Sequence, residues 1–203
     1  RSDRFLFERI MLPYLETWTR EVEVVARGSA AVVGATFAAG AAMAVVLGET
    51  WPDLFAAVGA HSGLPFAAAH DIPSALAAMK GRGVVGTVSG SGRATATVPT
   101  IVFHGDRDHT VQHSNGAHIA AQARRAAPSL QTRSDTGTAP GGRRYTRDMH
   151  TDAGGRVIVE RWTVHGAGHA WSGGDAAGSY TDNAGPDASA EMLRFFLAQV
   201  PRG

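Results

Sequence analysis

The chain has 203 residues, 44% hydrophobic and 18% charged, which fits a single domain over residues 1–203 with a packed core and argues against disorder. With 19 basic and 18 acidic residues, the net charge is +1 and no block of like charge stands out, so we expect no nucleic-acid partner. Because the sequence has no cysteine, disulfides, thiolate metal sites and cysteine nucleophiles are excluded.

The longest apolar stretch, residues 30–47, is rich in alanine and glycine rather than leucine. It predicts a buried strand, a turn and a helix, and not a membrane span. Residues 1–20 mix charged and apolar side chains and lack the layout of a signal peptide. We therefore expect no membrane association, while the compartment and the oligomeric state stay open.

The first half of the chain alternates short buried strands with helices. In chain order the patterns predict a helix over 5–18, strands over 21–26 and 31–34, a helix over 39–48, a strand over 54–61, a helix over 72–79 and a loop over 81–97. Pro52 ends the helix before it, because proline biases the preceding residue away from the helical conformation.

The second half continues the alternation and then adds a hairpin. The patterns predict a strand over 98–104, a helix over 114–126, a loop over 132–142, antiparallel strands over 143–149 and 157–164, a loop over 170–186 and an amphipathic helix over 188–199. Buried strands that alternate with helices indicate an α/β fold, with a mainly parallel sheet covered by helices on both faces.

Two acidic residues, Asp106 and Asp108, come directly after the strong strand that ends at His104. Ligands of open α/β sheets bind beyond the carboxyl ends of the strands, so acids at this place suit a functional site. They can equally cap the following helix or fix the turn. We expect Asp108 to be the catalytic acid and Asp106 to stabilise the turn.

A histidine on a glycine-lined loop, His169, is the candidate general base, because that role needs a partly exposed imidazole that a carboxylate orients. A surface-loop histidine without function is the alternative, and His165 at the strand end is expected to be structural. The spacings of His165 with His169, and of His109 with His113, resemble those of metal ligands. A zinc site needs a third ligand, so we expect no metal.

The segment Thr36-Phe37-Ala38-Ala39-Gly40 lies between a strand and a helix, where a nucleophile elbow of the pattern Gly-x-Ser-x-Gly is expected. Alanine at position 38 has no oxygen that could attack an ester. Judged alone, the segment is a buried strand-to-helix turn. Ser62, after the next strand, is a weaker candidate nucleophile, and its hydroxyl is expected to satisfy backbone groups instead.

Several stretches together resemble a known family: Trp51-Pro52-Asp53-Leu54, His61-Ser62-Gly63-Leu64-Pro65, Val102-Phe103-His104-Gly105-Asp106, the loop of His169 and Gly185-Pro186-Asp187-Ala188-Ser189. From about residue 39 to the C-terminus the chain is similar to the polyhydroxybutyrate (PHB) depolymerase-like esterases. These are α/β hydrolases related to feruloyl and acetylxylan esterases. Residues 1–34 match poorly, so the first strands of the sheet are expected to be missing or altered.

The resemblance implies a serine-type acyl transfer with Asp108 as triad acid, His169 as base and the nucleophile position at Ala38. The backbone N–H of Ala39 would be one oxyanion donor. The resemblance also implies a small or polymeric ester substrate, no cofactor and an extracellular location.

Two main hypotheses follow. The chain is an ester hydrolase by descent, inactive as written because position 38 is alanine. Alternatively, it is a non-catalytic protein that retains the cleft to bind an ester or polyester, with Phe37 and Trp171 as apolar walls. A metal-dependent hydrolase is a weaker third possibility.

Overall fold

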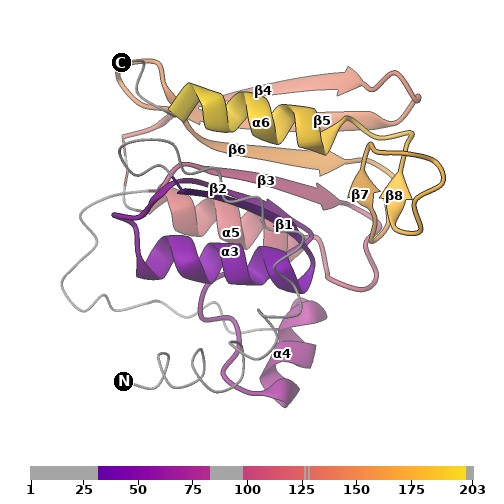
Figure 1. Ribbon diagram of the computed structural model, residues 1–203, viewed down its shortest axis with the longest axis horizontal. Helices are drawn as coiled ribbons and strands as arrows, with labels where there is room; N and C mark the ends of the chain where they lie inside the picture. Colours follow the sequence, from indigo (N-terminus) through magenta and orange to yellow (C-terminus); the bar gives the residue numbers. More distant parts are fainter. Residues whose placement is uncertain (1–31, 83–97, 126, 128, 200–203) are drawn as a thin grey trace.

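The computed structural model describes residues 32–82, 98–125, 127 and 129–199 (Figure 1). The helix expected over 5–18, the strand expected over 21–26 and most of the loop expected over 81–97 lie outside these residues. Within the described ranges, no helix is both long and apolar enough to cross a bilayer.

The described residues form a six-stranded sheet in the order β1-β2-β3-β6-β5-β4. Its first four strands are parallel: β1 (Val32–Phe37), β2 (Phe55–His61), β3 (Thr100–Gly105) and β6 (Val157–Val164). The last two are antiparallel: β5 (Arg144–Thr151) and β4 (Gln131–Thr138). The prediction of a mainly parallel sheet is therefore confirmed.

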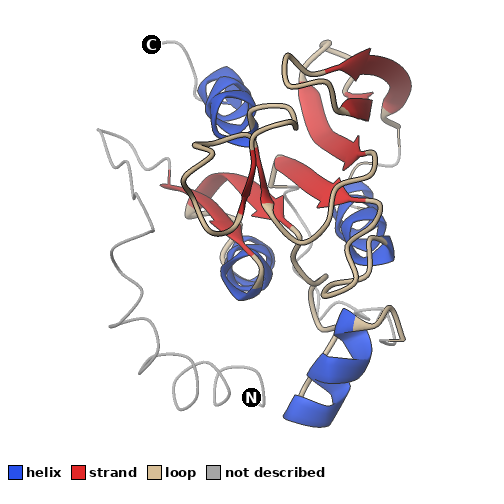
Figure 2. Ribbon diagram, turned by 90° about the vertical axis from the view of Figure 1, so that its right-hand side faces the viewer, coloured by secondary structure: helices blue, strands red, loops and turns tan. Residues whose placement is uncertain are grey.

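Helices cover both faces of this sheet (Figures 1 and 2). On one face lie α3 (Ala39–Thr50) and α5 (Ser114–Arg124), and on the other lies α6 (Ala188–Gln199). The short α4 (Ile72–Met79) lies farther from the sheet, beyond α5. Because successive strand residues point to opposite faces, Val102 joins the core under α3 and α5, while Phe103 joins the core under α6.

Two expected loops contain strands. The expected loop over 132–142 is largely β4, and the expected loop over 170–186 holds the two-residue strands β7 (Trp171–Ser172) and β8 (Thr181–Asp182). β4 has no large apolar side chain, and among the described strands it is an exposed edge strand that pairs with β5 alone. The usual alternation of apolar and polar residues is therefore absent, and pairing with its neighbour determines the strand.

The carboxyl ends of the four parallel strands meet at one edge of the sheet, so the segments that follow them gather there. Ala38 follows β1, Ser62 follows β2, Asp106 and Asp108 follow β3, and the loop of His169 follows β6. This edge positions the candidate site.

Candidate active site

The structure brings Asp108 and His169 together across 61 residues of chain. The ring Nδ1 of His169 lies 2.7 Å from Oδ2 of Asp108. The other carboxylate oxygen accepts hydrogen bonds from the backbone N–H groups of Thr110, at 2.9 Å, and Val111, at 2.8 Å. Asp108 is 1% exposed, so its orientation is fixed, and it can hold the imidazole in one tautomer.

The same surroundings keep Asp108 ionised. Burial opposes the charged form, but hydrogen bonds from His104, His169 and the Val111 N–H outweigh it, and the pKa of Asp108 lies well below its usual range. His104 is itself buried, with Nε2 at 2.8 Å from the Val111 carbonyl oxygen and 3.5 Å from Asp108. A permanently charged carboxylate can stabilise an imidazolium at His169.

Gly105 lets the two loops approach closely. A Cβ atom at this position would lie 2.3 Å from the carbonyl oxygen of Ala167, which no side chain can tolerate. The backbone N–H of Arg107 donates to that same oxygen at 3.0 Å. The contact between the loops, and with it the approach of His169 to Asp108, therefore depends on a residue without a side chain.

The turn at Ala38 has the conformation of a strained elbow. Its φ of 54° and ψ of −116° lie in a region that residues with a Cβ disfavour. The backbone N–H of Ala38 donates to the carbonyl oxygen of His61 at 2.9 Å, which ties the turn to the end of β2. The turn between β1 and α3 thus has a strained backbone, and the residue at its centre is an alanine.

Ala39 begins α3, and no side chain caps that helix end. The first N–H groups of a helix have no partner within the helix, and together with the helix dipole they favour negative charge. The N–H of Ala39 can therefore donate to a developing oxyanion, and this capacity does not depend on its side chain.

Both expected apolar walls belong to one aromatic cluster. Phe37, next to the elbow, packs on His169 with ring centroids 4.7 Å apart and faces Trp171 at 6.5 Å. The ring of His61 contacts both, with centroids 5.4 Å from Phe37 and 5.0 Å from Trp171. The cluster thus holds the ring of His169 against Phe37, which directly precedes Ala38 in the turn.

His61 is a residue whose part in the site the sequence did not indicate. Its Nε2 accepts a hydrogen bond from the backbone N–H of Ser172 at 2.9 Å, so the ring proton resides on Nδ1, which lies 3.2 Å from Ser62 Oγ. Burial, followed by the nearby His104 and His169, lowers the pKa of His61 to about 3. The neutral ring thereby connects the elbow to β7.

Ser62 is fully buried, and its φ is 53°. Its hydroxyl contacts the His61 ring rather than the backbone groups that we expected. Buried in this way, it is poorly placed to attack a substrate.

A second acid–histidine pair lies nearby. Asp106 accepts a hydrogen bond from Gly166 N–H at 2.7 Å, and its Oδ2 lies 2.8 Å from His165 Nδ1. The other ring nitrogen of His165 lies 2.9 Å from Thr146 Oγ1. Asp106 thus links the two loops instead of fixing only its own turn. Among the described residues, no three side chains of His, Asp or Glu are grouped to hold a metal.

Comparison with known proteins supplies the family. Residues 23–144, more than half of the chain, match the family model described as esterase PHB depolymerase. This match begins before residue 39, so our expectation of a poor match holds at most for the first 22 residues. No curated protein matches the chain.

Two solved structures are similar. An acetyl xylan esterase from Aspergillus awamori has a TM-score of 0.63 and 15% identity, over 97% of this chain and 67% of that one. A serine-to-alanine variant of a PHB depolymerase, complexed with an R3HB trimer, has a TM-score of 0.59 and 20% identity, over 85% of this chain and 52% of that one. The chain thus spans about two thirds and about half of the lengths of these proteins. It belongs to the esterase PHB depolymerase family and has the α/β-hydrolase fold.

Proposed function

We propose that this chain is the framework of a carboxylic ester hydrolase whose covalent step is disabled by alanine at position 38. The observation that carries the proposal is the Asp108–His169 pair, 2.7 Å apart, beside a strained turn that has the backbone of a nucleophile elbow. The match to the esterase family supports an ester or polyester as the substrate.

With serine at position 38, each group would have a defined task. The serine Oγ would attack the ester carbonyl while His169 takes its proton, and the charged Asp108 would stabilise the imidazolium. The N–H of Ala39 would donate to the oxyanion. His169 would then protonate the leaving alkoxide, and water activated by the same ring would release the acid.

The test is the Ala38→Ser variant assayed on a short p-nitrophenyl ester. We expect hydrolysis at least about a thousandfold faster than in the unchanged chain, because the missing nucleophile leaves only the contribution of binding and the oxyanion donors. The Ala38→Thr variant is a matched control, since its hydroxyl is on a β-branched side chain that fits the strained turn poorly. If both variants are as inactive as the parent although folded, the hydrolase proposal is wrong.

Covalent labelling gives an independent measurement. The unchanged chain should take up no organophosphate, because position 38 has no hydroxyl and Ser62 is fully buried. The Ala38→Ser variant should be labelled once, at the new serine. Stoichiometric labelling of Ser62 in the unchanged chain would overturn the assignment of the nucleophile position.

A non-catalytic role in binding esters is the second candidate, and the aromatic cluster favours it. Phe37 and Trp171 are both partly exposed, and their rings are in edge contact next to His169. Calorimetry of the unchanged chain with a non-hydrolysable ester analogue tests this role. Binding that is lost in Trp171→Ala, together with an Ala38→Ser variant that stays inactive, would favour the binding protein over the disabled enzyme.

A further inference from the structure

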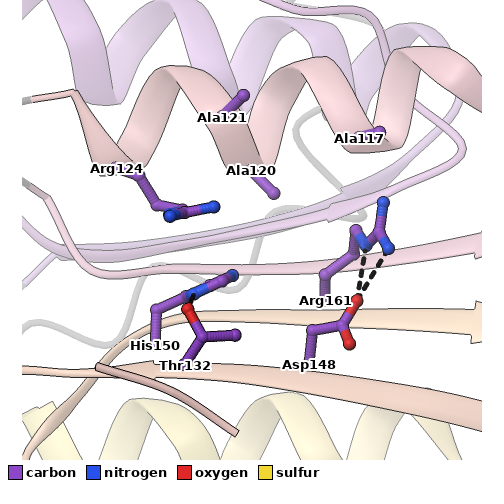
Figure 3. A pocket seen from close by; sticks show the side chains of 8 residues that line it. All are labelled: Ala117, Ala120, Ala121, Arg124, Thr132, Asp148, His150 and Arg161. Carbon is purple, nitrogen blue, oxygen red and sulfur yellow. Dashed lines mark hydrogen bonds and ion pairs between the residues drawn. The ribbon is translucent and has the colours of Figure 1, made fainter. Parts of the chain in front are cut away.

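A pocket of about 280 Å³ lies between α5 and the strands β4, β5 and β6 (Figure 3). None of the residues that line it belongs to the candidate active site. The space exists because three of the four α5 side chains that line it are alanines, at Ala117, Ala120 and Ala121.

The walls of the pocket carry more positive than negative charge. Arg124 extends from the last turn of α5 over His150, and Arg161 rises from β6 (Figure 3). Asp148 is the acidic side chain of the lining, and its Oδ2 accepts from both Nε and Nη2 of Arg161, at 3.2 and 2.7 Å. Ser134 donates to the other oxygen of Asp148.

Arg124 has no such partner, because no carboxylate within the described ranges forms an ion pair with it. The carboxylate of Asp148 is already satisfied by Arg161 and Ser134, so it does not neutralise Arg124. The guanidinium group of Arg124 thus provides a positive charge that is present at all physiological pH values, together with several N–H donors, toward the pocket.

His150 adds a group that can take up a proton. It is 5% exposed, and its Nδ1 lies 2.9 Å from the hydroxyl oxygen of Thr132. Burial and then the charge of Arg124 lower the pKa of His150, with Arg161 adding to this and Asp148 opposing it. The lowered pKa keeps the His150 ring neutral at neutral pH, and an anion in the pocket would offset the part of this shift that the positive charges cause.

We propose that this pocket binds the phosphate group of a small ligand through Arg124, His150 and Thr132. Two guanidinium groups and one carboxylate leave one excess positive charge, and protonation of His150 supplies the second charge that a phosphate dianion needs. A monovalent carboxylate would need no such protonation. The site is independent of the ester chemistry proposed above.

The experiment is an NMR titration of the His150 ring in the unchanged chain, with and without inorganic phosphate. The His150 signal is assigned by its loss in His150→Gln. We expect phosphate to bind and to raise the pKa of His150, because binding an anion and protonating the ring favour each other. Acetate should bind more weakly and shift this pKa less.

Arg124→Gln should weaken phosphate binding about tenfold or more, because a charge-assisted contact is lost. Arg156→Gln is the matched control, since Arg156 is an exposed arginine in the turn between β5 and β6 and its partner is Asp152. The proposal is overturned if phosphate leaves the His150 pKa unchanged, if acetate has an equal effect, or if both arginine variants bind phosphate alike.

Discussion

Two acid–histidine pairs connect the same two loops, yet they are built differently. Asp108 and His169 are the more buried pair, with 0% and 15% of their side-chain surfaces exposed, against 32% and 34% for Asp106 and His165. In His165 both ring nitrogens have partners, Asp106 and Thr146. In His169 only Nδ1 has one among the described residues, the carboxylate of Asp108.

The difference separates a structural pair from one that can work on protons. A general base needs one nitrogen held by an acid and the other available to the reacting group. His165 has no nitrogen left for that task, whereas the Nε2 of His169 is available. Under the proposed function, the partner of the second ring nitrogen therefore distinguishes the two histidines better than the contact with the acid does.

The largest effect should come from Asp108. In an Ala38→Ser background, Asp108→Asn should lower kcat by about 10⁴-fold, because the amide no longer holds the required tautomer of His169 or stabilises its charge. Asp106→Asn should lower kcat less than about tenfold. Ester hydrolysis assays on the two variants measure this ratio, and similar losses in both would remove the distinction between the pairs.

Gly105→Ala should disturb both pairs at once. The added Cβ would meet the Ala167 carbonyl oxygen at 2.3 Å, so the loops must separate. We expect the free energy of unfolding, measured by urea denaturation, to fall by about 3 kcal/mol. The atoms that the added Cβ meets belong to the backbone of Ala167 and Gly168, which cannot move aside as easily as the end of a flexible side chain. The control is Gly154→Ala, at an exposed turn where the added atom meets only an Asp152 side-chain oxygen at 3.3 Å. Equal stability of the two variants would contradict the close approach of the loops.

Asp106→Asn should have a smaller effect, on stability rather than on activity. The free energy of unfolding should fall by about 1 kcal/mol at neutral pH, since Asp106 is partly exposed and solvent weakens its contacts. Despite burial, hydrogen bonds from His165 and Gly166 lower the pKa of Asp106.

The pH dependence of that loss follows from the direction of the shift. Because the folded-state pKa of Asp106 is below the unfolded value of about 4, its contribution is present above that value and disappears as the pH falls through the folded-state pKa. The free energies of unfolding of Asp106→Asn and of the parent, measured by urea denaturation, should therefore become equal as the pH falls into the acid range. A difference in the free energy of unfolding that stays constant down to acid pH would argue against an ionised Asp106 in the contact with His165 and Gly166.

The smallest expected effect concerns His61. With a pKa of about 3, its ring should show no titration by NMR between about pH 5 and pH 8, where an ordinary histidine changes charge. Protonation of Nε2 would also break its bond with the Ser172 N–H. A titrating His61 would mean that the link between the elbow and β7 is absent in solution.

Strand and helix patterns predicted most of the described fold, because each buried element carries its own apolar signal. The helix over 72–79 was predicted to the residue, where Asp71 caps the start in a capping box. β4 was missed because this exposed edge strand has no apolar face, and no pattern in its own sequence predicts that it pairs with β5.

The candidate site was predictable only in part. Order along the chain and local composition singled out Ala38, Asp108 and His169, but the distances between them depend on the whole sheet. His61 was missed because its contacts join residues 111 positions apart, through Ser172 N–H, and no local pattern encodes such a contact. The role of Gly105 is likewise visible only when both loops are placed.

The backbone at Ala38 has a practical consequence for repair. A methyl group already stands at the Cβ position of the strained turn, so exchanging it for a hydroxymethyl group adds one oxygen atom and asks for no new main-chain path. Glycine at this position, by contrast, would relieve the backbone strain of the positive φ but has no Cβ atom to which a hydroxyl group could be attached. If the proposed function holds, repair of position 38 therefore requires a change of one side chain and no change of the fold.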